Sequence, residues 1–198
     1  MNAPIEPTRL KLTITQYRQM GERGILPPGE RVELIDGEII RMAPIGPPHA
    51  GILNRLLNDR LASLCKGKAV ISAQHPVEVD DYNEPQPDLC LLRWRDNYYI
   101  DRHPAPADVL LLIEISDSSL RYDRSVKRAL YARAGLPRYW IVDVNDRSVI
   151  VFSEPSPDGY RNEQRHREGE RLPLGGPDSP LAGLALDVSG IVGHLPPG

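Results

Sequence analysis

The chain has 198 residues and a mass of 22.1 kDa, a length that suits one domain, or one domain with small appendages. With 40% hydrophobic and 26% charged residues, its composition is that of a globular protein and excludes wholesale disorder. The net charge of −3 argues against a surface coated in positive charge for non-specific nucleic-acid binding, but it leaves room for a local basic site.

The sequence shows no sign of export. The N-terminal stretch MNAPIEPTRLKL lacks the basic start and apolar run of a signal peptide, and no apolar run approaches the roughly 18 residues that a membrane helix needs. Two cysteines, Cys65 and Cys90, do not make a disulfide framework, and Cys90 is best interpreted as a small core residue. We therefore expect a cytoplasmic protein with no membrane segment.

The N-terminal part predicts a short helix followed by a hairpin. Thr13 and Gln16 have the spacing of a capping box, so a helix is expected from there to about residue 22, with Gly24 just past its end. The pair Asp36-Gly37 then separates two β-rich runs in RVELIDGEIIRM, which is typical of a two-residue hairpin turn.

Two amphipathic helices are expected further along. The prolines of APIGPPH (43–49) predict an irregular loop, after which apolar residues recur at three- and four-residue spacing over 50–64. A second helix is predicted over about 122–134, after several N-cap candidates and before Gly135. We expect its buried stripe to consist of Tyr122, Val126, Ala129 and Leu130.

The remaining regular segments predict strands, at 69–79, 87–92, 108–116, 138–144 and 148–153. The order of helices and strands predicts a single α/β domain over 1–198, with a mixed central sheet flanked by helices and an N-terminal helix and hairpin. The core is expected over about 13–165. Beyond about residue 160 we expect little structure except one possible strand, and we interpret 166–198 as a Gly/Pro-rich C-terminal extension.

Two acids occupy unusual positions at the ends of apolar runs. Asp88 follows two prolines in EPQPDLCLL and directly precedes a strand with no polar alternation, and Glu114 ends another such run in DVLLLIEIS. Adjacent strands would bring the two carboxylates together, where they repel unless a divalent cation lies between them. Mg²⁺, or Mn²⁺ in its place, is the natural candidate because it binds hard oxygen ligands through one or two carboxylates plus phosphate.

A basic segment follows the second of these strands. Between residues 121 and 138 lie six basic residues and one acid, Asp123. Lys127 and Tyr131 are four residues apart and share a helix face. A helix that starts soon after Glu114 could direct Lys127 back to the metal site, where a lysine could orient an attacking water and offset charge on a phosphate.

These stretches resemble the Uma2 family of restriction endonucleases, within the PD-(D/E)xK nuclease superfamily. The resemblance rests on ELIDGEIIRMAP, PHAGI, EPQPDLCLL, PADVLLLIEISDSSLRYDR and KRALYARAGLPRYWIVDV, and it is most specific between residues 85 and 143. It implies a restriction-endonuclease-like fold and Mg²⁺-dependent hydrolysis of a phosphodiester, with Asp88 and Glu114 as metal ligands.

The resemblance also assigns supporting roles. The superfamily lysine expected two residues after the glutamate is Ser116 here, and Lys127 stands where related families carry it on the next helix. Glu33 matches an acid that supports the metal site from the N-terminal region, and Gln74 matches a polar position near it. The backbone carbonyl of Ile115 is a further candidate metal ligand.

Each candidate residue also has a plain structural interpretation. Asp88 could be a turn residue after prolines, and Glu114 could pair with an arginine of the basic segment. Lys127 could be a solvated helix lysine, and the basic segment a solvated helix face. We interpret His49 as a cap or loop residue rather than a metal ligand, because no second His or Cys stands at ligand spacing.

Two functions from different classes remain open. The first is a Mg²⁺-dependent endonuclease that acts on nucleic acid, DNA above all, and works as a homodimer if it cuts both strands. The second is a catalytically inactive nuclease-like fold that binds nucleic acid or a protein, which Ser116 in the usual lysine position supports. A purely structural module, in which the acids pair with the arginines of 121–138, is the third and weakest alternative.

Overall fold

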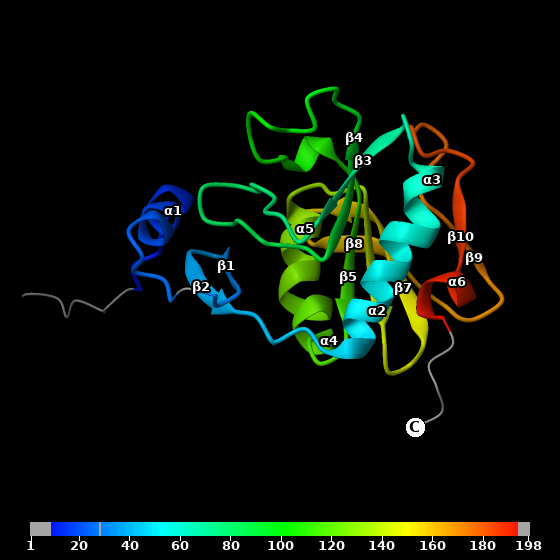
Figure 1. Cartoon of the computed structure of the whole chain (residues 1–198), viewed down its shortest axis with the longest axis horizontal. Coiled ribbons are helices and arrows are strands. Elements are labelled where there is room, and N and C mark those ends of the chain that lie inside the picture. The colour runs from blue at the N-terminus through cyan, green and yellow to red at the C-terminus, as the bar shows by residue number, and fades with distance from the viewer. Residues whose placement is uncertain (1–8, 28, 194–198) are drawn as a thin grey trace, which may run out of the picture.

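A mixed six-stranded sheet forms the centre of the molecule. The computed structural model describes residues 9–27 and 29–193. The strand order is β3-β4-β5-β6-β7-β8, and every neighbouring pair is antiparallel except β5 and β6, which are parallel (Figure 1). The bounds are β3 Ala69–Ala73, β4 Leu89–Arg93, β5 Val109–Ser116, β6 Arg138–Asp143, β7 Ser148–Ser156 and β8 Gly159–His166. The predicted fold class, a mixed sheet flanked by helices, is confirmed.

Strand β5 is buried on both faces, as its unbroken apolar run predicts. Leu111, Ile113 and Ile115 face one core cluster, to which helix α2 (Pro47–Arg55) also contributes. Leu112 faces the opposite cluster, beneath helix α5 (Arg128–Arg133). Because side chains alternate along a strand, Glu114 lies on the same face as Leu112 and therefore on the side of α5. The two helical segments flank the sheet in Figure 1.

The first helical segment begins earlier than expected. It consists of α2 (Pro47–Arg55), a π-helical turn η1 (Leu56–Leu61) and α3 (Ala62–Leu64). The expected loop over 43–49 is thus wrong at its end, because Pro47 and Pro48 lie in the first turn of α2. A proline is tolerated there since the first N–H groups of a helix have no partner within it.

The second helical segment also contains a π-helical turn. It runs through α4 (Leu120–Tyr122), η3 (Asp123–Lys127) and α5 (Arg128–Arg133). The wider turn shifts which residues face the sheet. Val126, predicted to be in the buried stripe, is 40% exposed, while Lys127 and Tyr131 are buried instead.

The N-terminal elements are those predicted. Helix α1 (Ile14–Glu22) begins with the Thr13–Gln16 capping box, and the hairpin strands β1 (Val32–Ile35) and β2 (Glu38–Arg41) are joined by Asp36-Gly37. Both turn residues have positive φ, 51° and 74°. These elements lie together at one side of the central sheet (Figure 1, blue). Backbone hydrogen bonds between Leu34 and Glu84 tie the hairpin to the loop before β4.

The C-terminal part carries more structure than expected. Strand β8 continues the central sheet, β9 (Arg171–Pro173) pairs with β10 (Ala185–Asp187), and α6 (Val188–Val192) follows. The expectation of little structure after about residue 160 is therefore wrong. Its apolar residues do not form a clear period, yet most of them are buried in the cluster beneath α2; those with no exposed surface are Leu172, Leu174, Leu181, Val188 and Ile191.

Apolar segments of the chain are short and belong to this core. Over residues 9–27 and 29–193, no helix combines the length and apolarity needed to cross a membrane. Cys65 and Cys90 are both buried and unbonded to one another, in agreement with the interpretation of Cys90 as a core residue.

The predicted strand over 69–79 ends at Ala73, because Gln74 turns the backbone with a φ of 55°.

Candidate active site

Asp88 and Glu114 meet at the ends of two adjacent strands. The antiparallel register pairs Leu89 with Ile113, which places Asp88 opposite Glu114. The Asp88 backbone N–H donates to Glu114 Oε2 at 3.3 Å, and the Ile115 N–H donates to Asp88 Oδ2 at 2.9 Å. Their exposures are only 4% and 2%. The convergence expected from the two strand ends is present.

Lys127 points from the π-helical turn η3 into the same place. Its Nζ donates to Glu114 Oε1 at 2.9 Å and lies 3.2 Å from Glu33 Oε2. Tyr131, one helical turn on, donates its hydroxyl to Glu114 Oε1 at 2.9 Å. Lys127 is therefore not a solvated helix residue, and Glu114 pairs with this lysine rather than with an arginine of the basic segment.

Burial and charge shift the protonation of these groups. Burial raises the pKa of Glu114 to about 8, although Lys127 acts to lower it. Burial alone would lower the pKa of Lys127, but the Glu114 and Glu33 carboxylates outweigh it and raise that pKa. Lys127 therefore remains charged at neutral pH. Burial would likewise raise the pKa of Asp88, but His49 and the Ile115 N–H outweigh it and hold that pKa below its usual value.

Glu33 and Gln74 border the two central acids. Glu33, on β1, is 1% exposed and accepts a hydrogen bond from the Gln86 backbone N–H at 3.2 Å. Gln74 approaches Asp88 Oδ1 with its Nε2 at 3.5 Å, a weak contact. Both therefore lie where the resemblance expects polar support, Glu33 through Lys127 and Gln74 through Asp88.

His49 is a site residue that the sequence interpretation missed. It is not the cap of α2, since Gly46 is the N-cap; its Nε2 lies 2.9 Å from Asp88 Oδ1, and its side chain is 12% exposed. A signal was available in the sequence. Residues 49, 52, 53 and 56 have the spacing of one helix face, and the last three are buried, Ile52 and Leu53 in α2 and Leu56 at the start of η1.

The position of the usual superfamily lysine serves another role here. Ser116 Oγ donates to Asp123 Oδ2 at 2.6 Å, and Ser119 Oγ donates to the same oxygen at 2.5 Å. Asp123 is 3% exposed and lies one helical turn before Lys127. It is a fourth buried acid of this region, after Asp88, Glu114 and Glu33, and the sequence interpretation had counted it only as the single acid of the basic segment.

A cavity of about 250 Å³ opens onto these side chains. Its wall is formed by the β1–β2 hairpin, the chain leading into α2, the ends of β4 and β5, and the segment from Asp117 to Lys127. The acids that line it outnumber the bases; the acids are Glu33, Asp88, Glu114, Asp117 and Asp123, and the bases are Arg31, Arg41 and Lys127, with His49 beside them. Such a cavity favours a cation.

Comparison with known proteins shows the family of this chain. A family model described as "Uma2: Putative restriction endonuclease" matches residues 14–189. The chain belongs to the Uma2 family. None of the curated proteins compared with it matches.

A solved structure has the same fold as this Uma2 chain. It comes from Anabaena variabilis and is described as "a putative nuclease belonging to DUF820". The two share 16% sequence identity, with a TM-score of 0.67, over 91% of this chain and 97% of that one. At this level of identity the likeness concerns the fold, and it supports the restriction-endonuclease-like architecture.

The Uma2 site has the donor types that Mg²⁺ prefers. Among the described residues no group of three His, Cys, Asp or Glu side chains is arranged to hold a metal ion. Mg²⁺ does not require one, since it binds through one or two carboxylates and completes its shell with water and phosphate. Two buried carboxylates that converge on a cavity fit this requirement. Each accepts a hydrogen bond from a backbone N–H group, which fixes its orientation.

Proposed function

We propose that this Uma2 protein is a Mg²⁺-dependent endonuclease that acts on DNA. The observation that carries the proposal is the convergence of Asp88, Glu114 and Lys127 in a cavity, held from two strand ends and one helix. Family membership supports a nuclease-type function in general. The metal, the choice of DNA and the roles of individual residues are our inference.

In this proposal Asp88 and Glu114 hold Mg²⁺ or Mn²⁺, and the backbone carbonyl of Ile115 adds a ligand. The bound ion would polarise the phosphodiester and lower the pKa of an attacking water. Asp88 suits this role since its pKa is already held low and its carboxylate is ionised at neutral pH. Glu114 must give up its proton to bind the ion.

Lys127 acts in the proposal as a fixed positive charge. Because its pKa is raised, it does not serve as a general base; it donates hydrogen bonds and offsets the charge that develops on the phosphate. Glu33 holds Lys127 from the other side at 3.2 Å and so positions it. Gln74 and His49 act on Asp88 and position that carboxylate.

A second candidate function is binding without cleavage. The observation that favours it is Ser116, which stands in the usual lysine position and donates to Asp123. A binder would associate with nucleic acid in a salt-dependent way that a chelator does not change. A homodimer belongs to the first proposal, because two sites are needed to cut both strands of a duplex, and light scattering would test it.

Cleavage assays on single-stranded, duplex and branched DNA and on RNA would test the proposal. We expect Mg²⁺-dependent cleavage of DNA that EDTA stops, and a loss of about a hundredfold or more in Asp88→Asn and in Glu114→Gln. Asp59→Asn is the matched control, because Asp59 is an exposed acid outside the cavity. Full metal-dependent activity in both site variants would refute the residue assignment.

A further inference from the structure

Three buried side-chain nitrogen or oxygen atoms of the cavity-lining residues have no hydrogen-bond partner among the described residues. One of them, Nε2 of His49, lies 2.9 Å from Asp88 Oδ1, whereas the other two, on Arg31 and Tyr122, have no charged partner in that part of the chain. Nη2 of Arg31 and the hydroxyl of Tyr122 are both inaccessible to solvent, and neither finds a hydrogen-bond partner within residues 9–27 and 29–193. Both residues line the cavity of about 250 Å³. Buried donors in folded proteins are nearly always paired, and an unpaired one is destabilising. Two in one cavity indicate a ligand that supplies acceptors.

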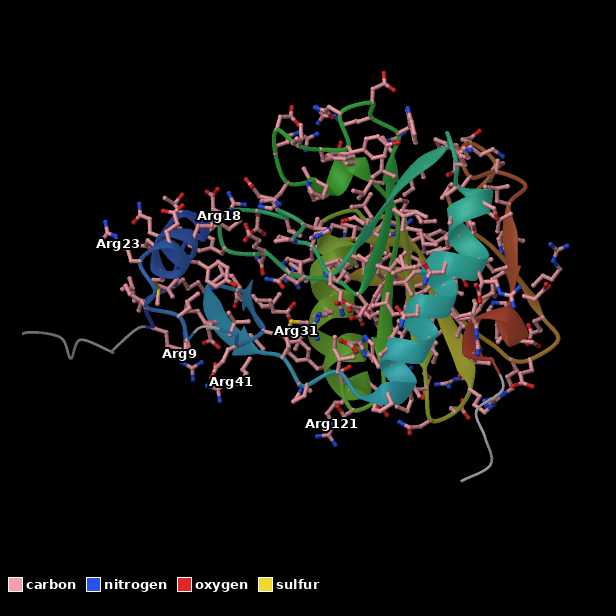
Figure 2. The ribbon with its side chains drawn as sticks, in the orientation of Figure 1. Arg9, Arg18, Arg23, Arg31, Arg41 and Arg121 are labelled. Atoms are coloured by element: carbon pink, nitrogen blue, oxygen red, sulfur yellow. The ribbon has the colours of Figure 1, made fainter. Side chains whose placement is uncertain are left out.

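The two donors come from separate elements that enclose the cavity. Arg31 directly precedes β1, two residues before Glu33, and Tyr122 is the last residue of α4, next to Asp123. Figure 2 shows Arg31 between the β1–β2 hairpin and the start of the α4–α5 segment. A ligand bound by both donors would therefore bridge the hairpin and the helix, beside the two central carboxylates.

Arg31 differs from Arg9, Arg18 and Arg41, which form ion pairs, and from Arg23, which is exposed. Arg9 lies 2.8 Å from Glu38, Arg18 2.8 Å from Glu78, and Arg41 2.9 Å from Glu30. For Arg31, no ion pair is found in the part of the chain that the structure describes, although several acids line the same cavity. Its guanidinium thus lies at the cavity without an ion pair to any residue that the structure describes.

The chemistry of the two donors favours an anionic oxygen ligand. A guanidinium is always charged and matches the geometry of phosphate oxygens. Burial and the Glu33 carboxylate raise the pKa of Tyr122, so the phenol keeps its proton and can donate it. A guanidinium has no lone pair to offer a metal ion, and a phenol that keeps its proton is a poor metal ligand.

We propose that Arg31 and Tyr122 form a phosphate-binding subsite beside the Asp88–Glu114 pair. The phosphate belongs to the nucleic-acid strand, either the scissile group or a neighbour of it, and this inference rests on the proposed function. The acids that line the cavity disfavour an anion when no cation is present. Phosphate binding is therefore expected to be stronger when Mg²⁺ is added.

Equilibrium binding of three probes tests the subsite. The probes are inorganic phosphate, a short oligothymidylate with a 5′-hydroxyl and the same strand with a 5′-phosphate, each measured by calorimetry with and without Mg²⁺. Arg31→Met and Tyr122→Phe should each weaken binding about tenfold or more, as expected for one hydrogen bond to a charged group. Arg23→Met is the control, since Arg23 is exposed and outside the cavity.

Thermal stability separates a binding role from a structural one. Tyr122→Phe removes an unpaired buried hydroxyl, so its melting temperature should equal or exceed that of the wild type while its phosphate affinity falls. If the site variants lose equal affinity for both oligonucleotides, the subsite binds an internal backbone phosphate. If they lose more affinity for the 5′-phosphorylated strand, the subsite binds a terminal phosphate. Both outcomes support the subsite.

Three results would overturn the subsite. They are no binding of any probe by the wild type with Mg²⁺, unchanged affinities in both site variants, or a marked destabilisation by Tyr122→Phe. The test needs no cleavage. A protein that binds phosphate through Arg31 and Tyr122 but cuts nothing retains the subsite and loses the nuclease proposal, so the two failures are distinguishable.

Discussion

Replacement of Lys127 by methionine should destabilise the protein through its buried acids. The ammonium lies 2.9 Å from Glu114 and 3.2 Å from Glu33, and the exposed fractions of the three side chains are 4%, 3% and 2%. Lys127→Met keeps the volume and the apolar stem but removes the charge. Glu33 and Glu114 would then share a buried region without the cation between them, and water could not replace it freely.

The size of the stability loss depends on whether a buried acid can take up a proton once Lys127 is removed. Removal of one partner from a buried ion pair typically costs about 3–5 kcal/mol. Glu114, whose pKa is about 8, already holds a proton for much of the time at neutral pH, and the loss of Lys127 would raise that pKa further. We therefore expect a loss at the lower end, about 3 kcal/mol, which for a chain of this size lowers the melting temperature by about 6–12 °C.

Guanidinium denaturation at pH 7 is the assay. Lys66→Met is the matched control, because Lys66 is exposed in the turn before β3, and it should change stability by less than about 0.5 kcal/mol. Glu33→Gln added to Lys127→Met should recover part of the loss, since it removes one of the two carboxylates. A Lys127→Met protein as stable as the control would refute the reasoning that this lysine neutralises the acids.

Three further predictions concern the site carboxylates and the turn of the β1–β2 hairpin. Since Glu114 has a pKa of about 8 and must ionise to bind a cation, Mg²⁺ affinity should fall about tenfold for each pH unit below 8 and level off above it. Glu114→Gln should remove this pH dependence. Calorimetry over a pH series would test both expectations, and a flat wild-type profile would contradict them. His49→Ala should raise the pKa of the Asp88 carboxyl, because the substitution removes a contact at 2.9 Å that lowers this pKa. Carboxyl ¹³C shifts of Asp88 measured against pH would test this. An unchanged Asp88 titration would show that His49 does not affect Asp88. Gly37→Ala should destabilise the protein by more than the roughly 1–2 kcal/mol expected from its φ of 74° alone, because the new Cβ would lie 2.5 Å from Lys11 Cβ. Gly24→Ala is the control in urea denaturation, since Gly24 has a φ of 67° and its new Cβ would have no atom within 4 Å. Equal losses of unfolding free energy in the two variants would exclude the clash.

Strands β3 to β7 and the hairpin were predictable because their signals are local. An unbroken apolar run predicted β5, and Asp36-Gly37 predicted the tight turn, which requires two residues at positive φ. Antiparallel pairing of β4 and β5 then sufficed to bring Asp88 and Glu114 together. Those two site residues could be placed from strand order alone.

Other features depended on geometry that periodicity does not contain. The π-helical turn η3 changes the register of its helix, so Val126, which was expected in the buried stripe, faces outward. His49 reaches Asp88 only because α2 begins at Pro47, before the residues with a clear apolar pattern. The C-terminal leucines, such as Leu172, are buried through long-range packing that leaves no local pattern.

Metal binding by isothermal calorimetry tests the central claim most directly. The wild type should bind Mg²⁺ or Mn²⁺, Asp88→Asn and Glu114→Gln should lose that binding, and Asp59→Asn should keep it. This result would show that the two strand-end carboxylates hold the cation. Undiminished metal binding in both site variants would contradict the claim and place any cation elsewhere in the molecule.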